Sequence, residues 1–173
     1  DGSKKSFEDG TAFTQRINLG GKLDVTNNKN GVSFKTTGAA EVKVYWVEGG
    51  DDNRQMALLT GSGTVVAKTE ETLAKNAACI SVLKVTEAGT YYLGGLENNN
   101  YIFKVVVTPE KEAESVSVTH MLDAADLEAF GAGAKKDGEE QSAGTDDYFT
   151  ILWSSKSKVD GSNKSFDDGT TLT

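Results

Sequence analysis

The stretch AEVKVYWVE, residues 40–48, alternates apolar and polar side chains over most of its length. Val42, Val44 and Trp46 share one face with a period of two, which is typical of a half-buried β-strand. The run NYIFKVVVT, residues 100–108, repeats this alternation with Tyr101, Phe103, Val105 and Val107. The two runs therefore predict strands whose apolar faces point toward a core or into a groove.

Further β-rich runs surround these two strands, and turn clusters such as TNNKNG, GGDD, TGSG, TEAG and LENNN divide them. Glycine occurs 19 times and proline only once. Short strands separated by such turns are typical of a sandwich. We therefore predict a mostly β chain folded as an antiparallel β-sandwich of jelly-roll or immunoglobulin-like type. The remaining predicted strands are Thr11–Leu19, Val32–Thr37, Gln55–Thr60, Gly63–Thr69, Ala78–Thr86 and Gly89–Gly95.

A different pattern follows Pro109, where the charged stretch PEKEAE closes the last strand of this series. Leu122–Phe130 has apolar residues at helical spacing and an aspartate start signal, so it predicts one short helix with Asp123 near its N-cap. Gly131–Asp147 is rich in glycine and charge and predicts a polar loop. Tyr148–Val159 then predicts one more strand.

The segment DGSKKSFEDGTAFT, residues 1–14, recurs as DGSNKSFDDGTTLT at residues 160–173 with ten identities and a constant offset of 159. A repeat of this length exceeds solenoid repeats of about 20–50 residues and matches one folding unit. The duplication predicts a parent protein made of tandem copies. We divide the chain into a main sandwich (1–108), a boundary (109–118) and a segment that resembles the opening of the next copy (119–173). This last segment could also complete the sandwich in permuted order, within the chain or by strand exchange with a neighbouring copy.

Composition excludes several classes of function. With 18 basic and 26 acidic residues the net charge is −8, which makes binding to nucleic acid or to an anionic membrane unfavourable. The chain has 37% hydrophobic residues, enough for one core, and no run of eighteen apolar residues. Its one cysteine, Cys79, lies in a predicted core strand and predicts an inert thiol. Its one histidine, His120, predicts a surface or linker position and lacks the partners of a zinc site or a triad.

Several stretches resemble the β-sandwich accessory modules of secreted plant-polysaccharide-degrading proteins, of the pectinase type, from gut Firmicutes. The resemblance lies in KVDGSNKSFDDGTTLT running on to TQRINLGGK, in GVSFKTTGAAEVKVYWVEGGDDNRQMALL, in EAGTYYLGG with NNNYIFKVVV, and in LDAADLEAFGAGAKKDGEEQSAGTDDYFTILWSSKSKVDGSNKSF. It covers nearly the whole chain. It implies an extracellular, secreted or surface-attached module that binds carbohydrate, such as a pectic glycan or the α-glucan starch, without catalysing a reaction.

Sugars bind where an aromatic ring meets the apolar face of a pyranose and planar polar groups meet its hydroxyls. The run YWVEGGDDNRQ offers such a set around one loop: Trp46, Asp52, Arg54 and Gln55. The run LENNNYIFK adds Asn99 and Tyr101. The alternative interpretation is that Trp46 continues the core face of its strand and that the remaining side chains belong to ordinary turns.

The carboxylates cluster in turns, which is typical of solvated loops rather than of the facing acid pair of a glycosidase. The chain is therefore predicted not to be an enzyme and to need no cofactor, although one or two acidic turns could bind structural calcium. The alternative function is a structural spacer or adhesin repeat of a cell-surface protein that binds no sugar. A fully buried Trp46 would favour that alternative. The acidic pairs are Glu8–Asp9, Asp51–Asp52, Glu70–Glu71, Glu139–Glu140 and Asp146–Asp147.

Overall fold

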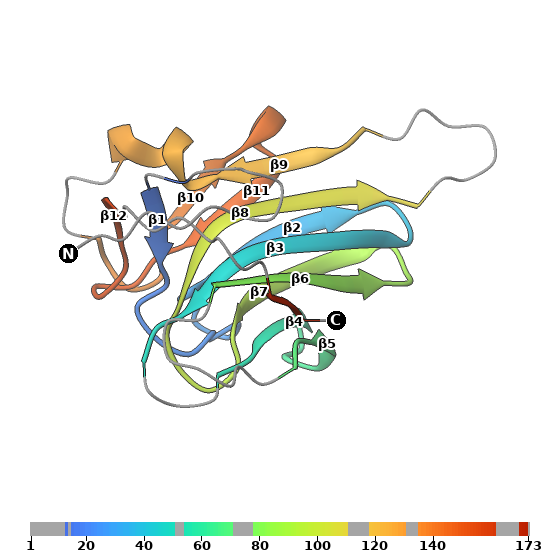
Figure 1. Ribbon diagram of the computed structural model, residues 1–173, viewed down its shortest axis with the longest axis horizontal. Coiled ribbons are helices and arrows are strands. Elements are labelled where there is room, and N and C mark those ends of the chain that lie inside the picture. Colours follow the sequence, from blue (N-terminus) through green and yellow to red (C-terminus); the bar gives the residue numbers. More distant parts are fainter. Residues whose placement is uncertain are drawn as a thin grey trace.

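A computed structural model of the protein describes residues 13, 15–50, 54–70, 78–110, 118–130, 135–161 and 170–172. The described strands form two sheets that pack into a β-sandwich (Figure 1). The predicted mostly β sandwich is therefore confirmed. The parallel pair β6–β13 is the one departure from antiparallel pairing among the described strands.

Sheet 1 has the strand order β12-β1-β8-β3-β6-β13, and β9 also pairs with β8. Its strands are β12 (Lys158–Gly161), β1 (Gln15–Asn18), β8 (Asn100–Pro109), β3 (Ala40–Glu48), β6 (Ala78–Val85), β13 (Thr170–Leu172) and β9 (His120–Asp123). Sheet 2 has the order β10-β11-β2-β7-β4-β5. Its strands are β10 (Glu140–Ala143), β11 (Phe149–Leu152), β2 (Gly31–Thr36), β7 (Gly89–Gly95), β4 (Met56–Thr60) and β5 (Val65–Lys68).

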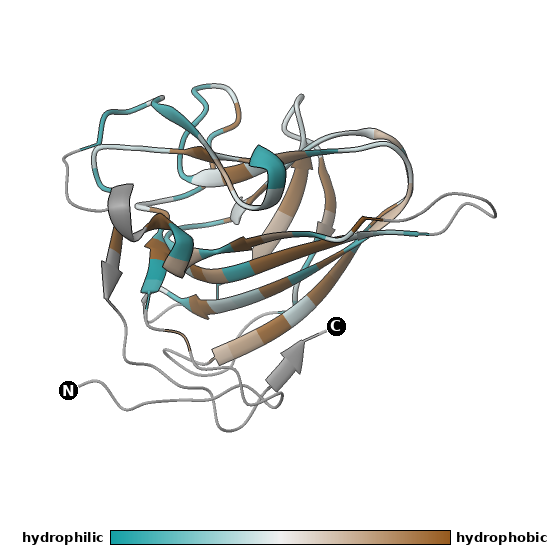
Figure 2. Cartoon of the chain, turned by 90° about the horizontal axis from the view of Figure 1, so that it is seen from above, coloured by the Kyte–Doolittle hydropathy of each residue, from teal (hydrophilic) through white to brown (hydrophobic). Residues whose placement is uncertain are grey.

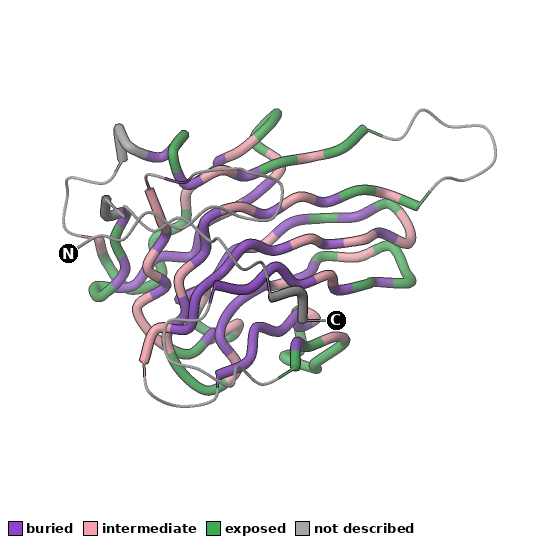
Figure 3. The backbone as a smooth tube through the Cα atoms, viewed as in Figure 1, coloured by how far each residue is buried: buried purple, intermediate pink, exposed green. Residues whose placement is uncertain are grey.

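The core lies between the two sheets and contains the inward face predicted for β3, but only part of the face predicted for β8. Phe103 and Tyr101 pack on the other face of sheet 1, and Ile102 enters the core instead, because the pairing of β3 with β8 shifts register between Tyr45 and Trp46. Val42, Val44 and Trp46 of β3 are fully buried, as are Val105 and Val107 of β8. Hydrophobic and hydrophilic residues alternate along the strands (Figure 2), and the buried residues concentrate on the central strands (Figure 3). Burial of this aliphatic and aromatic surface is the main stabilising contribution to the sandwich. Cys79 belongs to the same core, as predicted.

The predicted helix at Leu122–Phe130 is wrong in its first part. His120–Asp123 forms β9, which pairs with β8, and a 3₁₀ helix, η1, follows at Ala124–Phe130. Leu122 is fully buried, so its apolar side chain serves a strand rather than the first turn of a helix. Asp123 still accepts a hydrogen bond from the backbone N–H of Ala125 at 2.9 Å, as a residue at a helix start does.

Two other predictions for the C-terminal part are corrected. The supposed polar loop contains β10 and a short 3₁₀ helix, η2 (Thr145–Asp147). The supposed single strand Tyr148–Val159 is two strands in different sheets, β11 and β12. A turn separates them, in which the N–H of Ser157 donates to the carbonyl of Ser154 at 3.0 Å. The Ser157 hydroxyl donates to the carbonyl of Leu19 at 2.7 Å and so fixes the point where the chain crosses between sheets.

The C-terminal segment contributes strands to both sheets of the same sandwich. β11 pairs with β2, while β12 pairs with β1, so segments far apart in the sequence lie side by side (Figure 1). Phe149, Ile151 and Trp153 from this segment enter the core. The C-terminal segment thus pairs with strands of both sheets within the same chain.

Candidate functional site

The indole predicted to stack on a sugar is not available. Trp46 has no exposed surface, and its Nε1–H donates to the Ser81 hydroxyl inside the sandwich at 2.9 Å. The prediction of Trp46 as a stacking ring is therefore wrong, because the alternation of β3 turns this side chain inward with Val42 and Val44. The alternative interpretation, a core tryptophan, is confirmed.

The neighbouring predicted residues form a buried polar network that ties loops together. Arg54 Nη1 donates to the carbonyl of Asn99 at 2.6 Å, and its guanidinium lies against the backbone of Gly50. Gln55 Nε2 donates to the carbonyl of Thr69 at 2.6 Å. Arg54 and Gln55 are both buried. The Arg54 side chain links the β3–β4 and β7–β8 connections at one end of the sandwich, and the Gln55 side chain holds the backbone just after β5. Any contact of either side chain with a ligand stays a prediction.

Asn99 and Tyr101 lie at the same end and also have partners. Asn99 Oδ1 accepts a hydrogen bond from the backbone N–H of Gly20 at 2.8 Å. The Arg16 guanidinium lies 3.9 Å from the centroid of the Tyr101 ring, so a cation already covers this ring. Asp52 lies outside the described residues. The structure thus brings Arg54 and Asn99 together but does not surround an open aromatic surface with them.

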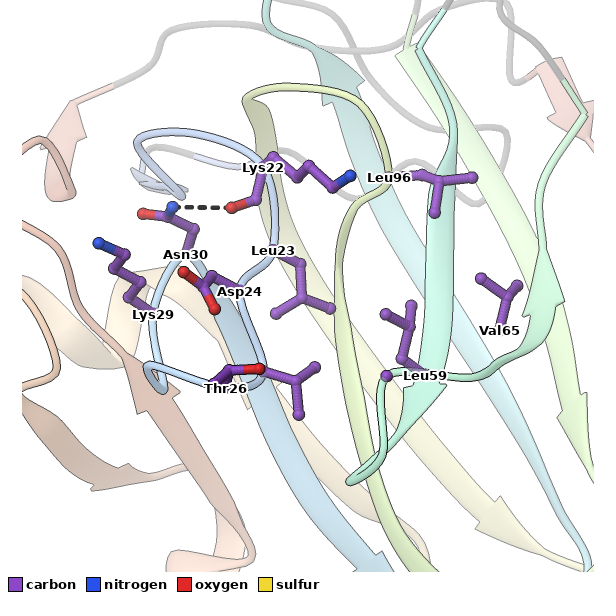
Figure 4. A pocket seen from close by; sticks show the side chains of 11 residues that line it. Lys22, Leu23, Asp24, Thr26, Lys29, Asn30, Leu59, Val65 and Leu96 are labelled. Atoms are coloured by element: carbon purple, nitrogen blue, oxygen red, sulfur yellow. Dashed lines mark hydrogen bonds between the residues drawn. The ribbon is translucent and has the colours of Figure 1, made fainter.

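A hollow of about 510 Å³ lies beside this end, between the β1–β2 loop and sheet 2. Figure 4 shows Leu59, Val65 and Leu96 on one side of the hollow, with Asp24, Lys29 and Asn30 across from them on the loop. We call this hollow the loop groove; its lining residues are Lys22, Leu23, Asp24, Val25, Thr26, Lys29, Asn30, Leu59, Gly63, Val65 and Leu96. The loop groove therefore combines an apolar side with a polar side.

Leu23 anchors the loop to the sheet. Its backbone N–H donates to the carbonyl of Gly95 at 2.9 Å. A Cβ atom placed on Gly94 would come within 2.8 Å of the Leu23 Cβ, and one on Gly31 would also collide with the Leu23 side chain. Two glycines on adjacent strands thus leave the space in which Leu23 packs, and a larger residue at either position would displace the loop.

The loop itself is stabilised by Asp24. Asp24 and Lys29 exchange two backbone hydrogen bonds of 3.0 Å. The carboxylate of Asp24 accepts from Asn27 Nδ2 at 2.8 Å and from the Asn27 N–H at 3.1 Å. The side-chain bond from Asn27, followed by the backbone bond, lowers the pKa of Asp24 below its ordinary value, because both bonds favour the charged form. The loop therefore carries an ionised carboxylate at neutral pH.

Asn30 is the most informative polar residue of the loop groove. It is 9% exposed, and its Nδ2 donates to the carbonyl of Lys22 at 2.7 Å. Its Oδ1 atom is buried and has no hydrogen-bond partner among the described residues. An unpaired buried acceptor costs about 1–3 kcal/mol, so a ligand that donates a hydrogen bond to this oxygen would recover that free energy. Hydroxyl groups are donors of this kind.

A second, smaller hollow of about 230 Å³ adjoins the loop groove and shares Lys29 and Asn30 with it. Its other lining residues are Gly20, Gly21, Asp137, Ser154, Ser155 and Lys156. Asp137 accepts from the backbone N–H of Ser155 at 2.6 Å and from Lys29 Nζ at 3.3 Å. These bonds, the one from Ser155 first, lower the pKa of Asp137 below its ordinary value. Together the two hollows are lined by three lysines and two aspartates.

The sequence indicated the site region only indirectly. The stretch TNNKNG predicts a turn, but its residues do not indicate that Asn30 is buried with an unpaired side-chain oxygen. The available signal is the number of asparagines in this turn: Asn28 and Asn30, on either side of Lys29, have positive φ of 49° and 65°, a conformation that asparagine tolerates. Within the described ranges, no three His, Cys, Asp or Glu side chains gather closely enough to hold a metal ion.

A comparison of the sequence with protein-family models and with curated protein sequences finds no match. Among the described residues, no helix has the length and hydrophobicity needed to cross a lipid bilayer. The structure defines the fold class as a two-sheet β-sandwich. A hollow at one end has one polar side and one apolar side. Functional inference therefore rests on the chemistry of that hollow.

Proposed function

We propose that the protein is a non-catalytic carbohydrate-binding module of an extracellular, secreted or surface-attached protein, and that it binds a polysaccharide or oligosaccharide in the loop groove. The observation that carries the proposal is the buried, unpaired Oδ1 of Asn30, a residue that lines both hollows, together with the apolar side chains Leu59, Val65 and Leu96 on the other side of the loop groove. A sugar ring offers the matching chemistry, because hydroxyls surround an apolar face.

The charges of the hollows favour a pectic glycan over a neutral glucan such as starch. Lys22 and Lys156 are exposed at the two hollows, although the whole chain has a net charge of −8. Lysines concentrated at one site attract the carboxylates of a polyuronate despite the overall negative charge. The ion pair between Lys29 and Asp137, 3.3 Å apart, leaves Lys22 and Lys156 as the cations that a uronate would meet.

A matched pair of variants tests the proposal. Their retention on insoluble polysaccharides is measured, and a glycan array measures their binding to soluble ligands. Val65 and Val66 are neighbours on β5 and are 41% and 43% exposed, but only Val65 lines the loop groove. Val65→Asp should abolish retention by placing a charge on the apolar side, whereas Val66→Asp should leave it unchanged. Equal retention of both variants would contradict a site in this groove. Product release from the same polysaccharides would contradict the non-catalytic assignment.

The second candidate function is a structural spacer or adhesin repeat that binds no sugar. The burial of Trp46 favours it, since no indole is left to stack on a ligand. Absence of retention on every polysaccharide, with a cooperatively folded protein, would support this candidate instead.

A further inference from the structure

The sandwich is assembled from two parts of the chain that meet along both sheets. We call residues 15–110 the body and residues 118–161 the completing segment. The completing segment adds β12 to β1, β11 to β2 and β9 to β8, each through four residue pairs. It also places Phe149, Ile151 and Trp153 in the core. Without this segment, β1 and β2 of the body would be open sheet edges beside an uncovered core.

The connection from the body to the completing segment joins two neighbouring antiparallel strands. β8 ends at Pro109 and β9 begins at His120, so residues 110–119 form the connection. Val107 of β8 lies opposite His120 of β9. Antiparallel neighbours need only a short connection, because the end of one strand lies beside the start of the next.

The other end of the completing segment lies beside the start of the body in the same manner. β12 and β1 are antiparallel and lie side by side (Figure 1), and Gly161 at the end of β12 is opposite Gln15 at the start of β1. In a protein of successive copies at the offset of 159, residues 162–173 lead directly into Gln15 of the following copy. Opposite residues of an antiparallel pair are only about 5 Å apart. Residues 162–173 are therefore long enough to join β12 to β1 of the following copy.

The completing segment can thus be connected to a body at either of its ends. Residues 110–119 and 162–173 differ little in length, and the entropy cost of closing a connection rises only slowly with length. The joined arrangement gives up β13, because β8, β3 and β6 separate this strand from β1 in sheet 1. β13 has only three residues, whereas the pairings of β9, β11 and β12 with the body are the same in both arrangements.

We propose that the completing segment is exchangeable and completes the sandwich of the following copy as well as that of its own copy. In the exchanged arrangement, residues 162–173 connect β12 to β1, and each body receives its missing strands from the copy before it. The partner that the open edges of the body recognise is therefore residues 118–161 of a second copy of this chain.

Exchange would bring two copies together at the smaller hollow. Lys29 of the body and Asp137 of the completing segment form an ion pair of 3.3 Å there. Asn28 Nδ2 of the body also donates to the Glu140 carboxylate of the completing segment at 2.8 Å. The body supplies Gly20, Gly21, Lys29 and Asn30 to this hollow, and the completing segment supplies Asp137, Ser154, Ser155 and Lys156. The loop groove, in contrast, is lined by residues of the body alone. In exchanged copies, the smaller hollow would thus contain side chains of two copies.

A two-copy protein, residues 1–173 followed directly by residues 15–173, tests the exchange with paired defects. Val44→Asp disables a body and Ile151→Asp disables a completing segment, because each places a charge in the core. The crossed variant carries Val44→Asp in the first copy and Ile151→Asp in the second. Its intact parts are then the completing segment of the first copy and the body of the second, which residues 162–173 connect.

The control variant carries both substitutions in the second copy and leaves the first copy intact. We expect the crossed and control variants to show cooperative melting transitions of similar amplitude, because each contains one intact sandwich. Loss of the cooperative transition in the crossed variant, beside a control that retains it, would overturn the proposal.

A rearranged chain decides the matter without any substitution. Residues 118–173 are followed directly by residues 15–117, so that residues 162–173 join β12 to β1 and the connection between β8 and β9 is open. We expect this chain to be a monomer that melts cooperatively. A rearranged chain that stays unfolded, or that folds only as a dimer, would show that residues 162–173 cannot make the connection, and the exchange would be refuted.

Discussion

Trp46 is fully buried because it shares the inward face of β3 with Val42 and Val44. Its Nε1–H is satisfied by the Ser81 hydroxyl at 2.9 Å, so the polar atom of the indole is bonded within the core. The alternation of side chains along β3, and not the ability of an indole to stack on a sugar, therefore determines that Trp46 points into the core.

Substitution of Trp46 should therefore affect folding and not binding directly. Trp46→Ala should lower the free energy of unfolding by about 3–5 kcal/mol, because it removes a large buried ring. Trp46→Phe should cost less, since it keeps most of the ring. Urea denaturation measures both, and Ser81→Ala separates the hydrogen bond, worth about 1 kcal/mol, from the packing. An unchanged free energy of unfolding in Trp46→Ala would contradict the core position.

Asp123 gives a test of pH dependence. Burial raises the pKa of this carboxyl above its ordinary value of 3.8. Between 3.8 and the raised pKa, the folded state binds more protons than the unfolded state, so stability falls as the pH rises through this window. Asp123→Asn keeps an oxygen for the N–H of Ala125 but removes the cost of a partly buried charge. We expect the variant to be more stable at pH 7.

The stability of Asp123→Asn and of the natural protein should converge as the pH falls below 3.8, where the aspartate is neutral in both states. Urea denaturation at a series of pH values measures this difference. Asp146 is an exposed aspartate outside this turn and provides the control variant Asp146→Asn. A variant Asp123→Asn that is less stable than the natural protein at pH 7 would contradict the account.

At the scale of the elements, the core strands were predictable and the C-terminal connections were not. The strands around Val42 and Val105 carry alternation strong enough to predict their type and the inward face of β3. The alternation does not predict the register shift between β3 and β8, which turns Phe103 to the outer face of sheet 1. His120–Asp123 is too short to show such a period, and pairing with β8 decides its strand conformation. The loop groove could not be predicted because it depends on the packing of Leu23 against Gly31 and Gly94, which lie on paired strands but far apart in the sequence.

Truncation tests whether the C-terminal strands belong to the folding unit. A chain that ends at Pro109 loses β9 to β13 and with them the buried side chains of Leu122, Phe149 and Trp153. We expect this truncated chain to show no cooperative melting. A chain that ends at Gly161 loses only β13 and should still melt cooperatively at a lower temperature. Cooperative melting of the shorter chain with unchanged stability would show that residues 1–109 fold alone.

At the scale of the whole molecule, the loop groove belongs to sheet 2. It is formed on β4, β5 and β7, through Leu59, Val65 and the neighbouring Leu96, whereas the Phe13 ring near the N-terminal end packs on Tyr45 and Phe103 of sheet 1. Phe13 is therefore not a groove residue, and each copy in a tandem protein would have a groove of its own. A tandem protein could then bind one polysaccharide through several grooves.

A tandem arrangement predicts avidity in a two-copy protein, made of residues 1–173 followed directly by residues 15–173. Binding of the second groove becomes intramolecular once the first is occupied, which raises the apparent affinity by a factor of about 100 or more. We expect retention on insoluble polysaccharide to increase accordingly, and Val65→Asp in either copy to return it to the level of one copy. If Val65→Asp in both copies left retention intact, the glycan would bind elsewhere on the sandwich.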